Sequence, residues 1–127
     1  MLTEGDTVAK TVLIADDAKV MRDILKDILT SMGLTVIGEA ATGKEAVEMA
    51  KQLKPDIITM DIVMPELNGI QALKEIIASN PDVIIIVVSA LGHESLVMEA
   101  LKNGAKDFVV KPFKKEDIVK AVEKYIH

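Results

Sequence analysis

Hydrophobic residues along this chain follow two alternating patterns, short unbroken apolar runs and longer stretches in which apolar residues recur every three or four positions. A short run rich in β-branched residues is typical of a strand buried on both faces, and the helical spacing predicts an amphipathic helix. The alternation predicts a parallel sheet built from βαβ units, with five strands and five helices. Strands are predicted at 10–15, 34–38, 56–60, 83–88 and 106–110, and helical patterns at 20–32, 42–53, 70–77, 93–103 and 114–126.

Capping and turn residues fall between these segments, as the alternation requires. Gly33 follows the first helical pattern, at the position where a glycine commonly caps the C-terminus of a helix. Residues 42–45 have the sequence of a capping box and predict the start of the second helix, which Pro55 ends. Residues 80–82, Asn-Pro-Asp, predict the turn into the fourth strand, and Gly104 predicts the end of the fourth helix.

Composition narrows the class of protein. The 127 residues suffice for one domain, and with 50% hydrophobic but only 2% aromatic residues its core must be aliphatic. Residues 1–9 are polar and unpatterned, and we expect a loose N-terminal tail without a signal peptide. The apolar runs are too short for membrane insertion and cysteine is absent, which fits a cytoplasmic protein. The net charge of −5 argues against binding to nucleic acid, which requires a basic face.

Four of the apolar runs stop at polar residues that phosphoryl chemistry can use. They end at Asp16-Asp17, Asp61, Ser89-Ala90 and Lys111-Pro112. If the runs are parallel strands, these endings share the carboxyl edge of one sheet, which is where open α/β folds bind ligands. Three carboxylates, a hydroxyl and an ammonium would then converge on one pocket.

Each of these residues also has an ordinary structural interpretation. Asp17 suits the N-cap of the first helix, and Asp61 suits a turn before Pro65. Ser89 is of a type common where strands end, and a lysine such as Lys111 is usually solvated. Taken one at a time, Asp17, Ser89 and Lys111 favour structural roles, and Asp61 fits either role equally well.

The combination favours phosphoryl chemistry. Three carboxylates a few ångströms apart repel one another by roughly 4 kcal/mol per close pair at an effective dielectric of about 20. One lysine leaves an excess of negative charge, and Mg²⁺, which accepts a few carboxylates plus water, would neutralise it. Such a site can receive a phosphoryl group on a carboxylate as an aspartyl-phosphate, with the metal and the lysine offsetting the charge of the transferring group.

Taken together, the motifs resemble those of response-regulator receiver domains, and among them the single-domain chemotaxis regulators of the CheY type. The resemblance rests on Asp16-Asp17, 61–65 with Gly69, Ser89-Ala90, 111–113 and the segment 104–108. It implies an α/β fold of the flavodoxin-like type, a doubly wound five-stranded parallel sheet in the order 2-1-3-4-5 with five helices. It also implies that residues 10–127 are the receiver domain, with no output domain.

The resemblance assigns roles to the matching residues. Asp61 is expected to be the phosphoacceptor and, with Asp17 and the backbone carbonyl of Val63, to bind Mg²⁺ directly. Asp16 is expected to bind the metal directly or through water. Lys111 is expected to contact the phosphoryl oxygens, with a cis peptide before Pro112 as a further possibility.

Three residues are implicated in a conformational switch. The resemblance implies that Ser89 hydrogen-bonds the phosphoryl group and draws its loop inward. Phe108 is then expected to change rotamer, because the small side chain of Ala90 leaves room for it. The changed surface is expected to comprise the fourth helix, the fifth strand and the fifth helix.

The implied protein is a phosphorylation-switched signalling protein of a two-component chemotaxis system. Its expected partners are a histidine kinase, a target such as the flagellar motor switch, and a phosphatase. It is expected to be monomeric. It is not expected to be an enzyme beyond its own phosphorylation and autodephosphorylation. Val63 and Leu91 are apolar where enterobacterial chemotaxis regulators carry polar groups.

Three alternatives remain open at this point. One is a phosphorelay carrier that passes the phosphoryl group to another histidine. Another is a small Mg²⁺-dependent phosphohydrolase with Asp61 as nucleophile, although the haloacid-dehalogenase type requires an Asp two residues later, where this chain has Val63. The third is a flavodoxin-like cofactor binder, against which Asp16-Asp17 would repel a phosphate unless a cation intervenes.

Overall fold

The computed structural model describes residues 10–66 and 68–126, in which strands and helices alternate as predicted. The strands are β1 (Thr11–Ala15), β2 (Thr35–Ala40), β3 (Ile57–Met60), β4 (Ile84–Ser89) and β5 (Asp107–Val110). The helices are α1 (Lys19–Ser31), α2 (Gly43–Leu53), α3 (Gly69–Ser79), α4 (Glu94–Lys102) and α5 (Lys115–Glu123). The predicted loose tail, residues 1–9, lies outside the described residues.

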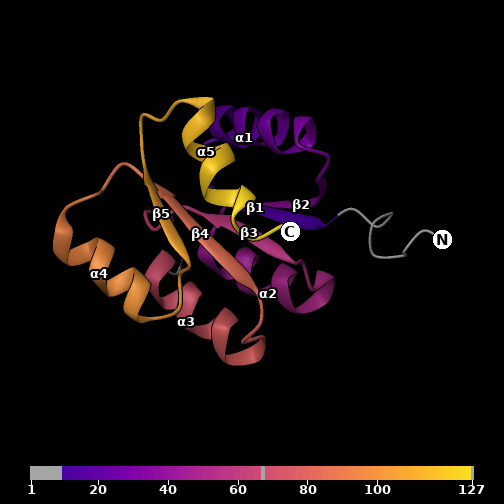
Figure 1. The fold of residues 1–127 in the computed structure, drawn as a ribbon. Helices are drawn as coiled ribbons and strands as arrows, with labels where there is room; N and C mark the ends of the chain where they lie inside the picture. The colour runs from indigo at the N-terminus through magenta and orange to yellow at the C-terminus, as the bar shows by residue number, and fades with distance from the viewer. Residues whose placement is uncertain (1–9, 67, 127) are drawn as a thin grey trace.

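The five strands form one parallel sheet in the order β2-β1-β3-β4-β5, which confirms the predicted doubly wound fold. Helices α1 and α5 cover one face of the sheet, and α2, α3 and α4 cover the other (Figure 1). The chain runs from β1 outward to β2 and then returns past β1 to β3. The strand order therefore reverses between β1 and β3, and their carboxyl ends flank the crevice where such sheets bind ligands.

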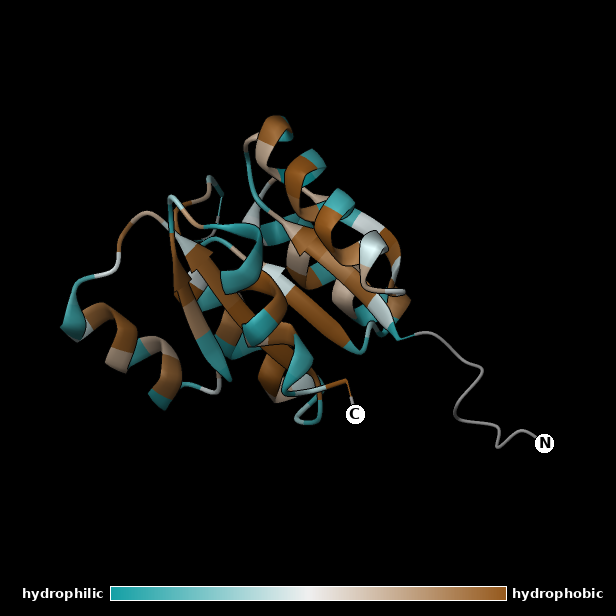
Figure 2. Ribbon diagram, turned by 45° about the horizontal axis from the view of Figure 1, so that its top comes forward, coloured by the Kyte–Doolittle hydropathy of each residue, from teal (hydrophilic) through white to brown (hydrophobic). Residues whose placement is uncertain are grey.

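An aliphatic core lies on each face of the sheet. Adjacent residues of β3 face opposite cores because side chains alternate along a strand: Ile58 packs in the cluster that contains Leu73 of α3, and Ile57 in the cluster with Leu29 and Ile118. Figure 2 shows the hydrophobic residues concentrated in the central strands and on the inner sides of the helices. Burial on both faces explains why the strands appear in the sequence as unbroken apolar runs.

The predicted end of β2 was wrong, and the reason lies in Gly38. The prediction ended the strand at this glycine. In the structure β2 continues to Ala40, which pairs with Ala15 of β1. A Cβ on Gly38 would lie 2.9 Å from the side chains of Met49 and Leu53, so this glycine allows α2 to approach the sheet closely.

Two predicted helices also differ from the structure at their ends or faces. Helix α5 stops at Glu123 and not at residue 126, although Tyr125 and Ile126 still pack against the core. The apolar stripe of α1 is wider than its buried face, since the side chains of Val20 and Ile24 are exposed. The spacing of apolar residues predicts that a helix forms, but it does not predict how much of the apolar stripe the neighbouring elements bury.

The predicted caps are largely confirmed. The Thr42 hydroxyl accepts a hydrogen bond from the Glu45 N–H at 3.0 Å, as an N-cap does. The Glu45 carboxylate accepts from the N–H of Ala41 and not from that of Thr42, so the reciprocal bond of the capping box is shifted by one residue. Gly33 has a φ of +87° and follows the C-cap of α1, a conformation that favours glycine.

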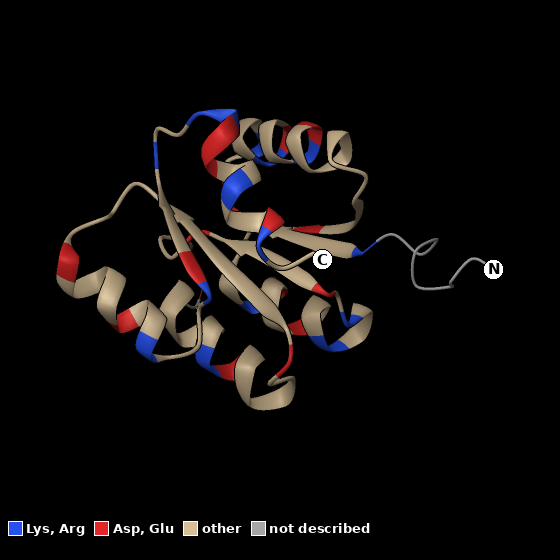
Figure 3. Cartoon of the chain, viewed as in Figure 1, with Lys and Arg blue, Asp and Glu red and all other residues tan. Residues whose placement is uncertain are grey.

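Charged residues lie mainly on the helices and loops, with both signs along each helix (Figure 3). Within the described residues, no helix is both long and apolar enough to span a membrane.

An acidic candidate site at the carboxyl edge of the sheet

The register of the central strands brings Asp16 and Asp61 side by side. Ala15 pairs with Met60, so the residue after each strand emerges at the same level of the sheet. The Asp61 N–H extends the ladder by donating to the carbonyl oxygen of Ala15 at 2.9 Å. The predicted convergence of strand ends is therefore a direct consequence of parallel pairing between β1 and β3.

The three predicted carboxylates form one cluster. Asp16, Asp17 and Asp61 each offer one carboxylate oxygen, and these atoms all lie within 4.8 Å of one another. Asp16 is 1% exposed and Asp61 7% exposed, whereas Asp17 is exposed. Oxygen donors of this kind suit a hard divalent cation, and the exposed Asp17 leaves one side open to solvent.

Asp17 does not cap α1, so this structural interpretation was wrong. The N-cap of α1 is Ala18, which makes no side-chain capping bond. Instead, the N–H of Ala18 donates to the Oδ1 of Asp16 at 2.9 Å, a turn within the loop that leads into the helix. The helix begins one residue later than an Asp17 cap would give, and the Asp17 carboxylate remains available to the cluster.

Lys111 follows β5, the strand at one side of the sheet, and reaches the cluster along the carboxyl edge. Its Nζ donates to the Oδ2 of Asp16 at 2.8 Å and to the Oδ2 of Asp61 at 2.9 Å. Strand β5 is separated from β3 by β4, and neighbouring strands lie about 4.8 Å apart, so the long side chain must cross the end of β4. The peptide between Lys111 and Pro112 is cis, as the resemblance suggested.

The surroundings of Lys111 keep it protonated. Partial burial is the largest influence and lowers its pKa, but hydrogen bonds and charge attraction from Asp16 and Asp61 together outweigh it. The pKa of Lys111 is therefore raised above its ordinary value of 10.5. The single positive charge of the ammonium balances only one of the three negative charges of the cluster, so an excess of negative charge remains.

The loop after Asp61 is held against its carboxylate and against α3. The N–H of Val63 donates to the Oδ1 of Asp61 at 3.0 Å, while the Val63 side chain is exposed. The N–H of Gly69 donates to the carbonyl oxygen of Ile62, and a Cβ on Gly69 would lie 2.2 Å from the Cα of Ile62. Only glycine permits this approach, so Gly69 at the first turn of α3 keeps the loop in place.

Ser89 and Phe108 occupy neighbouring strands behind the site. Ser89 is buried at the end of β4; its Oγ accepts from the N–H of Leu91 at 3.2 Å, and its carbonyl oxygen accepts from the N–H of Lys111 at 2.8 Å. Phe108 of β5 pairs with Val87 and packs, half-buried, against the core beneath α4. Ala90 is exposed in the loop that follows Ser89.

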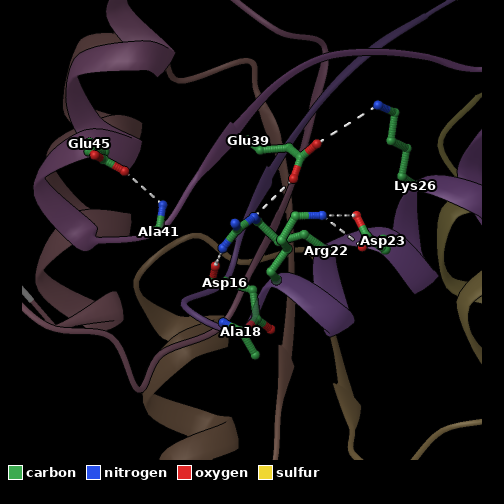
Figure 4. Close-up of polar contacts among 9 residues, drawn as sticks. Asp16, Ala18, Arg22, Asp23, Lys26, Glu39, Ala41 and Glu45 are labelled. Atoms are coloured by element: carbon green, nitrogen blue, oxygen red, sulfur yellow. Dashed lines mark hydrogen bonds and ion pairs between the residues drawn. The ribbon is translucent and has the colours of Figure 1, made fainter.

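The sequence interpretation missed Arg22 and Glu39. Arg22 of α1 donates from Nη1 to the carbonyl oxygen of Asp16 at 2.7 Å and from Nε to the Oε1 of Glu39 at 2.9 Å (Figure 4). Glu39 is the polar residue near the end of β2, and the rule applied to the other four strands would have found it.

A family profile described as the response regulator receiver domain matches residues 12–123. The chain belongs to this family. Receiver domains bind Mg²⁺ at an acidic pocket, and Asp16, Asp17 and Asp61 form such a cluster here. The motif-based recognition is thereby confirmed.

Individual relatives place this receiver domain near the chemotaxis regulators. The chain is 58% identical to the chemotaxis protein CheY of Thermotoga maritima over 91% of this chain and 96% of that protein. It is 47% identical to the CheY of Bacillus subtilis, over 94% of this chain and 99% of that protein. A solved complex of CheX with CheY, BeF3 and Mg from Borrelia burgdorferi contains a similar chain, with a TM-score of 0.91, 39% identity and coverage of 95% and 92%.

Proposed function

We propose that this receiver domain is a cytoplasmic, phosphorylation-switched signalling protein of a chemotaxis system. It accepts a phosphoryl group from a histidine kinase on Asp61, with Mg²⁺, and the surface of α4, β5 and α5 then changes its affinity for a protein target such as the flagellar motor switch. The observation that carries the proposal is the convergence of three carboxylates and the Lys111 ammonium at one edge of the sheet.

The donor set of the cluster fits Mg²⁺. Three carboxylate oxygens within 4.8 Å of one another, with one ammonium beside them, form an oxygen-rich site whose excess negative charge a divalent cation would balance. Asp17, Asp61 and the Val63 carbonyl are the proposed direct ligands, and Asp16 is a ligand directly or through water. When bound, Mg²⁺ supplies positive charge to the oxygens of the transferring phosphoryl group.

The proposed chemical step is a transfer between two nucleophiles. A carboxylate oxygen of Asp61 forms the new O–P bond as the P–N bond of the phosphohistidine breaks, and the electron pair of that bond leaves with the imidazole. Lys111, held by Asp16 and Asp61 before transfer, can keep its Asp16 contact and turn toward the phosphoryl oxygens. Its ammonium then stabilises charge that is greatest during and after the transfer.

The output of the proposed switch runs through Ser89. Its hydroxyl is the neutral group that can donate to new phosphoryl oxygens, and it now accepts a bond from the N–H of Leu91. Moving Ser89 would pull the loop that carries Ala90 and vacate space into which half-buried Phe108 can turn. Two states that differ by only a few kcal/mol suffice for phosphorylation to shift their populations.

Exposed apolar side chains on α4 are suited to a protein target. Met98 and Leu101 are exposed on this helix, and such residues commonly form the buried core of an interface. A partner of the CheX type, as in the Borrelia complex, is a further proposed partner on grounds of similarity. We propose that the domain itself is monomeric.

One mixing experiment tests the chemistry. The protein is incubated with Mg²⁺ and a small phosphodonor, and intact mass and the rate of phosphate release are recorded, with Asp61→Asn as the control. We expect one added phosphoryl group on the wild-type chain and none on Asp61→Asn. Rapid multiple-turnover release of phosphate would favour the phosphohydrolase alternative, and transfer onward to an added histidine phosphotransfer domain would favour the phosphorelay carrier.

A second experiment tests the switch. Backbone amide NMR spectra are compared with and without a beryllofluoride mimic of the phosphoryl group. We expect shifts in the loop after β4, in α4 and at Phe108. Shifts confined to the loops around Asp16, Asp61 and Lys111 would contradict the switch and leave only a phosphoryl carrier.

A further inference from the structure

Arg22 joins the loop that carries the acidic residues to the edge strand of the sheet. Its guanidinium donates to the carbonyl oxygen of Asp16 at 2.7 Å and to the carboxylate of Glu39 on β2 at 2.9 Å (Figure 4). The Arg22 side chain is only 15% exposed. A planar guanidinium with several donors can make both bonds at once, which a lysine ammonium at the end of a flexible chain does less well.

The atom that Arg22 holds belongs to the peptide bond between Asp16 and Asp17. Because a peptide unit is planar, fixing its carbonyl oxygen fixes the direction in which the chain enters Asp17. The N–H groups on both sides of this peptide unit are also hydrogen-bonded. The N–H of Asp16 donates to the carbonyl oxygen of Ala40 at 2.9 Å, and the N–H of Ala18 donates to the Asp16 carboxylate at 2.9 Å. Arg22 adds a bond to the peptide unit through which the chain enters the exposed Asp17.

The positive charge of Arg22, taken alone, would weaken the binding of a cation at the acidic cluster. A positive group near an acidic cluster repels a divalent ion, so its removal should tighten metal binding if electrostatics were its only contribution. Glu39 reduces this repulsion by pairing with Arg22, and Lys26 shares the same carboxylate at 3.9 Å. Positioning and charge therefore predict changes of opposite sign, which makes the role of Arg22 measurable.

We propose that Arg22, anchored by Glu39, is a positioning residue that orients Asp17 for Mg²⁺. This inference rests on the proposed Mg²⁺ site. Partners that orient metal ligands without touching the ion typically change metal affinity about 10- to 100-fold when they are removed. Arg22 acts on the backbone of the ligand and not on its carboxylate, so we expect an effect near the lower limit.

The test is a Mg²⁺ titration of the unphosphorylated protein followed by amide NMR. Arg22→Lys keeps the charge but not the double contact, and we expect its Mg²⁺ affinity to fall about tenfold. Arg22→Met should also bind more weakly, although it lacks a positive charge. Lys26→Met is the matched control: it removes a cation that pairs with the same Glu39 but makes no bond to the loop, and its affinity should be unchanged or slightly higher.

The outcomes separate this inference from the function on which it rests. Wild-type affinity in Arg22→Lys, or tighter binding in Arg22→Met, would overturn the positioning role. Thermal unfolding is measured alongside, and a lower Tm with unchanged Mg²⁺ affinity would mean a purely structural role and also overturn it. If the wild-type chain binds no Mg²⁺, or Asp17→Ala binds as well as wild type, the proposed function fails instead.

Discussion

The acidic cluster and the outer face of α4 are built in opposite ways. In the cluster, Asp16 and Asp61 are almost fully buried, and each carboxylate accepts hydrogen bonds from the loop that follows it and from Lys111. Helix α4 buries only Ala100 and exposes Met98 at 63%. Buried polar groups need defined partners, whereas a helix with little buried surface can shift at small cost in free energy.

The difference does not come from the face of the sheet on which α4 lies. Helix α3 lies on the same face and buries four of its residues, including Leu73 and Ile76. It covers the middle of the sheet, whereas α4 covers the edge near β5. Its position at the edge leaves α4 with fewer neighbours than α3. A rigid acidic cluster beside a loosely packed α4 suits the proposed switch, in which the chemical site stays fixed and the target-binding surface moves.

The largest effect is expected at the cluster itself. Asp17→Ala should abolish Mg²⁺ binding, because the remaining carboxylates cannot readily hold an ion that loses its water reluctantly. Isothermal titration with Mg²⁺ measures the affinity, and Asp82→Ala is the control because Asp82 is an exposed acid at the opposite edge of the sheet. Undiminished binding in Asp17→Ala would remove this residue from the metal site.

The packing contrast between α3 and α4 can be tested by stability. Leu73→Ala should lower the free energy of unfolding by about 2–5 kcal/mol, since it leaves a cavity in the core. Met98→Ala should change it by no more than about 0.5 kcal/mol, since the side chain is already in water. Urea unfolding measures both, and similar losses for the two variants would show that α4 is held as firmly as α3.

Lys111 provides a test that depends on pH. Its folded-state pKa is raised, so its contribution to stability is fully present below the unfolded value near 10.5 and is lost as the pH rises through the folded value. The stability difference between wild type and Lys111→Met should therefore be constant from neutral pH to about pH 9 and shrink above pH 10.5. Urea unfolding without Mg²⁺ measures it.

The same variant should bind Mg²⁺ severalfold more tightly at neutral pH, because a competing cation is gone. A stability difference that grows at alkaline pH, or weaker Mg²⁺ binding in Lys111→Met, would contradict the arrangement in which Lys111 neutralises Asp16 and Asp61.

A small gain in stability is expected from a substitution at Thr59, which lies on β3 two residues before Asp61. Thr59 is 1% exposed, and its hydroxyl has no hydrogen-bond partner among the described protein groups. Thr59→Val replaces an unpartnered polar group by a methyl group and should raise the free energy of unfolding by about 1 kcal/mol. Thr59→Ser is the companion variant, because it keeps the hydroxyl that Thr59→Val removes. A loss of stability in Thr59→Val would mean that the hydroxyl makes a stabilising hydrogen bond.

Sequence patterns predicted the sheet, the helices and most of the candidate site for identifiable reasons. Strands buried on both faces carry unbroken apolar runs, so their carboxyl ends are visible in the sequence, and with them Asp16, Asp61, Ser89 and Lys111. The errors occurred where a residue type has more than one use. Gly38 was taken as the last residue of β2 when it lies within the strand and allows close packing of α2, and Asp17 suited a helix cap that Ala18 occupies instead.

The sequence by itself therefore determined which residues lie at strand ends, because hydrophobic periodicity is a local property of the chain. Only the tertiary structure decided which of them meet. The pairing of β1 with β3 sets Asp16 beside Asp61, and the reach of Lys111 across the end of β4 joins an edge strand to the centre of the sheet. The contact of Arg22 with both Glu39 and the Asp16 carbonyl was also decided by the tertiary structure: Glu39 stands at a strand end that the sequence shows, but no local pattern pairs it with Arg22 of α1.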